Sequence, residues 1–139
     1  MKIAVLERNS VGTDIDVTCF EDFGEVTYYK NTVAADAAEK VKDVDIIIAN
    51  KAPMNEETLK DAPNVKLICE FATGFDNIDL EYCKKRRIKV ANVKDYSTAA
   101  VAQHTFALAL YLLEHLPHYD TYVKDGSYGA QDRVSNFDL

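Results

Sequence analysis

The sequence has little glycine, proline or cysteine. Its 139 residues include five Gly, three Pro and three Cys, while 47% of the chain is hydrophobic. This composition excludes disordered, collagen-like and low-complexity proteins, and the length favours a single globular domain with a real core. The cysteines, Cys19, Cys69 and Cys83, are odd in number and lack the spacing of metal ligands. We therefore expect neither a disulfide framework nor a metal site.

Basic charge and long apolar runs are also scarce. The chain has 16 Lys and Arg against 23 Asp and Glu, a net charge of −7, which is the wrong sign for binding nucleic acid. The first apolar run is broken by Glu7 and Arg8, so it is too short for a signal peptide. The most apolar window, Ala99–Leu113, falls short of the roughly 20 residues that span a bilayer. We expect a cytoplasmic protein without a membrane partner.

Short apolar runs alternate with stretches of helical periodicity along the chain. The runs typical of buried strands are Ile3–Leu6, Val26–Tyr29, Ile46–Ala49, Leu67–Cys69 and Ile88–Ala91. The stretches typical of helices are Asp14–Phe23, Val33–Lys42, Glu56–Ala62 and Asp79–Arg86, with Thr32 and Asn55 as expected N-caps. Strict alternation predicts an α/β fold, a flavodoxin-like doubly wound parallel sheet of five strands in the order 2-1-3-4-5.

The fifth strand is followed by the longest expected helix, Thr98–Leu116, which Pro117 helps to end. Its sequence is apolar nearly all round, and such a helix needs burial on more than one side. We expect a lobe over residues 1–116 that includes this helix. The tail, residues 117–139, is expected to form a short helix near residues 119–124 that is broken by its glycines.

Ligands of doubly wound sheets bind beyond the carboxyl ends of the strands, and the turn Phe71–Asn77 is the most informative of these ends. It combines small residues with Gly74 before an expected helix start, so its main-chain N–H groups could hold an anion. Turn chemistry alone leaves a structural alternative open. In that alternative Gly74 only supplies a positive φ, and Asp76 or Asn77 caps the next helix.

Three motifs in order resemble one known family. They are Ala72-Thr73-Gly74-Phe75-Asp76-Asn77-Ile78-Asp79, Ile88-Lys89-Val90-Ala91-Asn92 and Ser97-Thr98-Ala99-Ala100-Val101-Ala102-Gln103-His104. Together they are similar to the N-terminal, substrate-binding domain of NAD-dependent D-2-hydroxyacid dehydrogenases, closest to the D-lactate and D-2-hydroxyisocaproate enzymes. The resemblance implies an oxidoreductase lobe that binds a small 2-keto or 2-hydroxy acid and is hinged to a separate Rossmann domain.

The resemblance also implies the residues of the site. Main-chain N–H groups of Ala72, Thr73 and Gly74 would hold the substrate carboxylate. Further lining would come from Lys51, Ala52 and Pro53, and an apolar wall from Phe75 and Tyr96. Thr98 and Val101 would lie near the nicotinamide of the cofactor in the complete enzyme.

The parts of the family that the sequence does not match are equally informative. The glycines nowhere form G-x-G-x-x-G, so we expect a chain truncated before the Rossmann domain, with NAD only in the complete enzyme. The family's catalytic Arg, Glu and His have no counterparts, since His104 beside Gln103 matches a structural helix motif. We expect weak substrate binding and no turnover. Arg87 stands where the family usually has Gly, and we expect a left-handed residue there at a cost of roughly 1 kcal/mol.

Two other classes of function remain open at this point. One is a free-standing flavodoxin-like module that binds FMN through Asn9–Thr13, whereas a phosphorylated receiver is disfavoured because Asn50 follows the third strand. The other is a self-associating scaffold. For the dehydrogenase lobe too we expect a homodimer through helix 98–116, one form of which exchanges the helix and tail between chains.

Overall fold

A computed structural model describes residues 1–130 and divides the chain into two compact units, Met1–Asp95 and Tyr96–Leu139. The boundary expected at residue 116 stays a prediction. Within the part of the chain that the structure describes, no helix is long and apolar enough to cross a membrane. The three cysteines are free.

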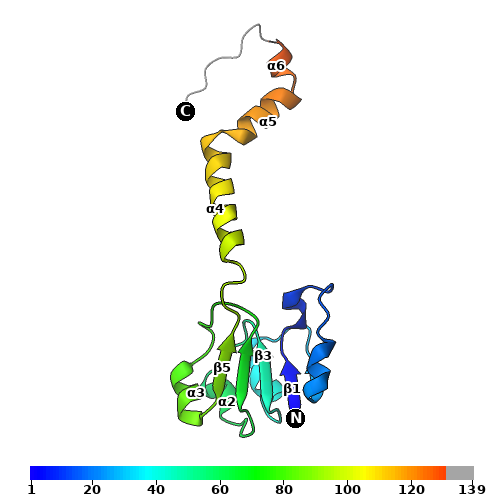
Figure 1. The fold of residues 1–139 in the computed structure, drawn as a ribbon, viewed down its shortest axis with the longest axis vertical. Helices are drawn as coiled ribbons and strands as arrows, with labels where there is room; N and C mark the ends of the chain where they lie inside the picture. The colour runs from blue at the N-terminus through cyan, green and yellow to red at the C-terminus, as the bar shows by residue number, and fades with distance from the viewer. Residues whose placement is uncertain (131–139) are drawn as a thin grey trace. The chain divides into compact units, whose positions relative to one another are not determined.

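The first unit is built on one parallel sheet whose strand order is β2-β1-β3-β4-β5, and three of its strands are labelled in Figure 1. The strands are β1 Lys2–Val5, β2 Glu25–Tyr28, β3 Ile46–Ala49, β4 Leu67–Glu70 and β5 Lys89–Asn92. All five predicted strands and the predicted order are confirmed, with ends that differ by at most one residue. The apolar runs succeed as predictors because these strands lie inside a covered sheet.

Helices connect the strands, and one of the predicted helices is wrong. The helices of this unit are α1 Ala34–Val41, α2 Glu56–Leu59, α3 Leu80–Arg86 and two 3-10 helices, η1 Arg8–Val11 and η2 Thr18–Phe23. The stretch predicted as an α-helix over 14–23 is therefore only a 3-10 turn, because the Asp16 side chain accepts from the N–H and hydroxyl of Thr18 and favours a turn.

Of the predicted N-caps, one is confirmed and the others are wrong. Asn55 caps α2 by accepting from the N–H of Thr58 at 3.1 Å, as predicted. Thr32 does not cap α1, whose N-cap is Val33, because its hydroxyl instead donates to the carbonyl of Leu6 at 2.6 Å. The alternative caps suggested for α3 are also wrong, since Asp79 fills that position.

The two faces of the sheet are covered unequally. The larger cluster joins one face to α1, α2 and α3 through Val41, Leu59 and Cys83, all almost fully buried. On the other face only Ile3, Val5 and Ile48 are buried, and they pack against partly buried side chains that include Phe20 of η2. The main core therefore lies under the three α-helices.

Arg87 ends α3 in the left-handed conformation that the sequence predicts. Its φ is 58° and its ψ 29°, and the N–H of the next residue, Ile88, bonds the carbonyl of Cys83 at 2.8 Å. Lys84, Lys85 and Arg86 place positive charge on the last turn, where cations favour the helix dipole. The hydrogen bonds of this ending hold Arg87 in a conformation that usually selects glycine.

The second unit, within its described residues, consists of three helices: α4 Thr98–Leu113, α5 Leu116–Lys124 and α6 Ser127–Ala130. The predicted helix 98–116 ends three residues early because His115 is left-handed, with φ 49°. Pro117 opens α5 rather than closing α4, which fits its missing N–H. Gly126, with φ 83°, separates α5 from α6, whereas Gly129 lies inside α6 and breaks nothing.

Candidate functional site

Two turns meet at the carboxyl edge of the sheet, one after β3 and one after β4. Met54 and Ile78 form an isolated parallel bridge between them. The N–H of Met54 bonds the carbonyl of Asn77 at 2.8 Å, and the N–H of Asp79 bonds the carbonyl of Met54 at 2.9 Å. These bonds hold the segment 50–54 against the segment 71–79, and both contain predicted substrate-binding residues.

The turn Ala72–Gly74 is fixed from one side and open on the other. Its carbonyls and hydroxyl are engaged with the end of β5: Asn92 Nδ2 donates to the carbonyl of Thr73 at 2.7 Å, and Thr73 Oγ1 donates to the carbonyl of Val93 at 2.9 Å. The N–H of Val93 bonds the carbonyl of Ala72 at 3.1 Å. Among residues 1–130, nothing accepts from the N–H groups of Ala72, Thr73 and Gly74. The turn therefore offers three free donors on a fixed backbone.

Gly74 contributes space rather than an unusual backbone angle. It does not have a positive φ, so the structural alternative considered for it is wrong on this point. A Cβ at this position would contact only Asp76 Oδ2, at an ordinary 3.7 Å. The chain itself therefore does not require glycine here, and the open space next to the free N–H groups can receive a ligand.

Glu7 anchors the turn after β3. It follows β1, is 7% exposed, and its carboxylate accepts from the N–H of Asn50 at 2.6 Å and from the N–H of Lys51 at 3.0 and 3.1 Å. Hydrogen bonds to an ionised acceptor are about twice as strong as neutral ones. The strand order reverses between β1 and β3, where a doubly wound sheet can bind a ligand. At this point the Glu7 carboxylate, rather than a ligand, occupies the main-chain N–H donors.

Glu70 is the second buried acid, at the end of β4. It is 2% exposed, its Oε2 accepts from Asn77 Nδ2 at 3.2 Å, and its Oε1 has no partner among the described residues. Burial, together with the charge of Glu7, raises the pKa of Glu70 to about 7, although the bond from Asn77 opposes this shift. The side chain is therefore a neutral acid at mildly acidic pH.

Replacing Glu70 with glutamine is expected to raise stability at pH 8 by about 2 kcal/mol. A raised pKa means that the unfolded chain loses this proton first, so wild-type stability falls between about pH 4.5 and 7 and then levels off. The full shift corresponds to about 3 kcal/mol, of which roughly 1 is lost because the new amide has no acceptor. Urea unfolding at pH 4.5 and pH 8 measures the difference, with Glu25→Gln at an exposed strand end as the control. Equal pH dependence in wild type and Glu70→Gln would contradict this account.

The structure brings together the predicted site residues of the first unit. Lys51 is exposed, Pro53 is half-buried, and Phe75 is 42% exposed. Ala52 is buried in the core, and it is its carbonyl that takes part at this edge, by accepting from Asn77 Nδ2 at 3.1 Å. Tyr96, Thr98 and Val101 belong to the other unit, and their roles stay predictions.

The loop considered for FMN lies beside a polar cavity of about 320 Å³, lined by residues that include Glu7, Asn9, Ser10 and Lys51. A phosphate there would need main-chain N–H groups, but Glu7 already takes those of Asn50 and Lys51. The Arg8 guanidinium is likewise committed, to the carbonyls of Gly12 and Ile15 at 2.6 Å each. These contacts disfavour a flavin or phosphate at this loop.

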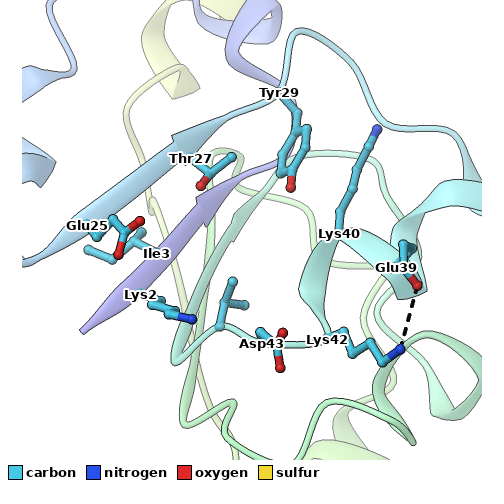
Figure 2. Close-up of a pocket in the computed structure, with 10 residues that line it drawn as sticks. Lys2, Ile3, Glu25, Thr27, Tyr29, Glu39, Lys40, Lys42 and Asp43 are labelled. Carbon is cyan, nitrogen blue, oxygen red and sulfur yellow. Dashed lines mark ion pairs between the residues drawn. The ribbon is translucent and has the colours of Figure 1, made fainter.

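A second cavity, of about 250 Å³, lies where β1 and β2 meet α1 (Figure 2). Three of its six charged side chains, those of Glu39, Lys40 and Lys42, contact neighbouring groups. Lys42 pairs with Glu39 at 3.9 Å, and Lys40 Nζ lies 4.9 Å from the centre of the Tyr29 ring and donates to the Asn31 carbonyl. The cavity carries both signs of charge and none of the predicted site residues, so we assign it no role.

Pattern reading missed Glu7, Glu70 and Asn77. In the sequence, Glu7 and Glu70 stand out only as residues that follow two predicted strands, where turns begin. A usable signal does exist, because each acid directly continues a strand that is otherwise buried. A carboxyl group at such a position must be paired or neutral, which marks it as part of a network.

Comparison with known proteins shows which family the chain resembles. Residues 3–134 match the family model described as D-isomer specific 2-hydroxyacid dehydrogenase, catalytic domain. A hydroxypyruvate reductase of Blautia hydrogenotrophica is 34% identical over 132 residues, which cover 92% of this chain and 41% of that protein. A glyoxylate reductase of Pyrococcus furiosus is 32% identical over 121 residues, covering 86% of this chain and 34% of the relative.

A solved structure points the same way. D-lactate dehydrogenase from Aquifex aeolicus, complexed with NAD and lactic acid, superposes with a TM-score of 0.75 at 29% identity, covering 97% of this chain and 39% of that one. The chain thus spans about two fifths of the length of this enzyme and of the reductase from Blautia hydrogenotrophica. The family resemblance found in the motifs is confirmed: the chain belongs to the D-isomer-specific 2-hydroxyacid dehydrogenases.

Proposed function

We propose that this chain is the substrate-binding lobe of a D-2-hydroxyacid dehydrogenase, and that it holds the carboxylate of a small 2-keto or 2-hydroxy acid on the N–H groups of Ala72, Thr73 and Gly74. One observation carries the proposal: these donors are free within residues 1–130, while hydrogen bonds from Asn92 and to Val93 fix the turn that presents them. Fixed donors bind an anion without a large ordering cost.

The neighbouring turn supplies charge and an apolar surface. Because the Lys51 N–H is bonded to Glu7, its exposed ammonium group is the part of Lys51 that remains for a ligand. Pro53 and the exposed ring of Phe75 provide apolar contact for the substrate's carbon chain. This set positions a keto acid but offers no general acid for its carbonyl, so the role we propose for it is binding and orientation.

The binding proposal is tested by titrating the labelled chain with pyruvate. The amide signals of Thr73 and Gly74 are expected to move first and to saturate only at high concentration. Gly74→Ala fills the space beside the donors without a clash inside the chain, and is expected to weaken binding roughly fivefold, the equivalent of about 1 kcal/mol. Gly129→Ala, where an added Cβ meets nothing within 4 Å, is the control. Movement confined to Asn9–Thr13 would refute the proposal.

The first unit does not fit NAD as a resident cofactor. The sequence has no G-x-G-x-x-G, and at the switch point the N–H groups of Asn50 and Lys51 already bond Glu7. In the complete enzyme we propose NAD as the cofactor, with Thr98 and Val101 of α4 near its nicotinamide end.

We further infer that residues 1–139 alone do not catalyse hydride transfer. The purified chain, mixed with NADH and pyruvate or hydroxypyruvate, is expected to oxidise no more NADH than the blank. The expectation rests on the missing cofactor fingerprint and on a site that only positions its substrate. Oxidation that scales with protein concentration and is lost in Gly74→Ala would overturn it.

The partner proposed for α4 is a second copy of this chain. Within its own unit α4 has no buried residue, and exposed apolar side chains occur all round it. They include Phe106, Leu110 and Leu113, which recur at helical spacing and are 71%, 55% and 67% exposed. An apolar helix of this kind needs a covering surface, and a second α4 offers a self-complementary one.

A further inference from the structure

Asn77 joins the two turns of the candidate site through one amide group. Its Nδ2 donates to the carbonyl of Ala52, in the turn after β3, and to Oε2 of Glu70, at the end of β4. Its main-chain carbonyl accepts from Met54. The separation between Lys51–Pro53 and Ala72–Gly74 is therefore set through Asn77, and Glu70 is one of the acceptors that hold the Asn77 side chain in place.

Burial and the charge of Glu7 favour the neutral form of Glu70, although the bond from Asn77 favours the ionised form. Its Oε1 is buried without a partner, and an unpaired charge there would be costly. Glu7 is the one charged group that acts on it among the described residues. Its neighbours in the sheet register, Ala49 on β3 and Asn92 on β5, are uncharged, as is Asn77.

We propose that Glu70 is a positioning residue which, by accepting from Asn77, keeps the two substrate-binding turns at the spacing that an anion requires, and that the anion binds to the form of the chain in which Glu70 is neutral. The inference rests on the proposed binding of a keto acid at Ala72–Gly74, and it adds that this binding depends on the proton of Glu70. Ionisation adds a second negative charge near Glu7, on the residue that lies two positions before the turn proposed to receive the carboxylate.

The consequence is a linkage between anion binding and proton uptake. A ligand carboxylate disfavours the ionised form of Glu70, just as Glu7 does. If the bound anion raises the pKa of Glu70 by about one unit, affinity falls about tenfold once Glu70 is ionised. Since that pKa is about 7 in the free chain and about one unit higher with the anion bound, most of the fall occurs between about pH 7 and 8.

The first experiment needs no ligand. In the labelled chain, the side-chain amide signals of Asn77 are expected to shift with pH and with the same midpoint as the Glu70 carboxyl carbon. In Glu70→Gln, which keeps a neutral acceptor for Asn77, this shift is expected to disappear. An Asn77 amide that does not titrate in the wild type, or that titrates equally in the variant, would overturn the positioning role whether or not the chain binds keto acids.

The second experiment measures the dissociation constant of pyruvate at pH 5.5 and pH 8.5. The wild type is expected to lose about tenfold in affinity at the higher pH, whereas Glu70→Gln keeps its low-pH affinity at both. Asp76→Asn is the matched control, because it removes an exposed acid from the same segment while leaving Asn77 and Glu70 in place. Asp76→Asn is expected to keep the pH dependence of the wild type, and an equal pH dependence in wild type and Glu70→Gln would overturn the inference. Failure of pyruvate to bind at either pH would refute the proposed function and, with it, the linkage.

Discussion

Replacing Glu7 with alanine is expected to lower the free energy of unfolding by about 3 kcal/mol. The substitution removes the acceptor of two main-chain N–H groups, those of Asn50 and Lys51, which bond the carboxylate at 2.6 to 3.1 Å. Each charge-assisted bond contributes roughly 1.5–3 kcal/mol, and water reaching the exposed Lys51 offsets part of the loss. Glu7→Ala is also expected to lower the pKa of Glu70, because the Glu7 charge raises it.

Urea unfolding at pH 7 measures the change. Glu7→Gln retains one carbonyl acceptor and is expected to lose about half as much. Glu25→Ala, at an exposed position at the start of β2, tests the effect of removing an acid that accepts no such bonds. If Glu7→Ala and Glu25→Ala destabilise the chain equally, the anchoring role assigned to Glu7 is wrong.

The second large effect is expected at α4, where Phe106→Glu should convert a dimer into a monomer. Covering roughly 400 Å² of apolar surface at about 25 cal/mol per Å² contributes about 10 kcal/mol to the free energy of association. The loss of free rotation and translation on association offsets part of this gain. A dissociation constant near 1 μM is therefore reasonable for the wild type. Burying a glutamate in that contact is expected to raise it at least about a hundredfold.

Light scattering across a dilution series follows the mass of each variant. Val33→Lys, which alters an exposed apolar residue of the first unit (61% exposed), is expected to leave the dissociation constant unchanged. A wild-type chain that stays monomeric throughout the micromolar range would contradict pairing through α4. Equal weakening by both substitutions would contradict the choice of surface.

The strands were the part of the fold most open to prediction from sequence. Runs such as Ile46–Ala49 and Leu67–Glu70 lie in the middle of a parallel sheet, so burial forces nearly every position to be apolar and the pattern is unambiguous. The residues before η2 are different. Their apolar positions fit an α-helix. However, the Asp16 side chain accepts from the N–H of Thr18, and this local Asx turn replaces the main-chain bonds that an α-helix would need.

Part of the candidate site could also be predicted from the sequence, and part could not. The turn at Ala72–Gly74 is recognisable because small residues and glycine are contiguous in sequence. Glu7, Glu70 and Asn77 come from three separate segments, and their relation exists only after the sheet has brought the ends of β1 and β4 close to β3. No spacing along the chain indicates these contacts. The sequence can therefore mark each acid as unusual, but it cannot predict that the two acids lie close together.

The unequal covering of the sheet has a consequence for how the first unit opens. Under the three α-helices, exchange of amide hydrogens requires disruption of the main core, which is close to global unfolding. Over Ile3, Val5 and Ile48, the cover includes a short 3-10 segment that itself holds no buried residue. Such a segment can detach while the strands stay paired. We therefore expect residues 18–23 to form a low-energy foldon, so that insertions or cleavage there leave the turns after β3 and β4 on an intact β1-β3-β4 frame.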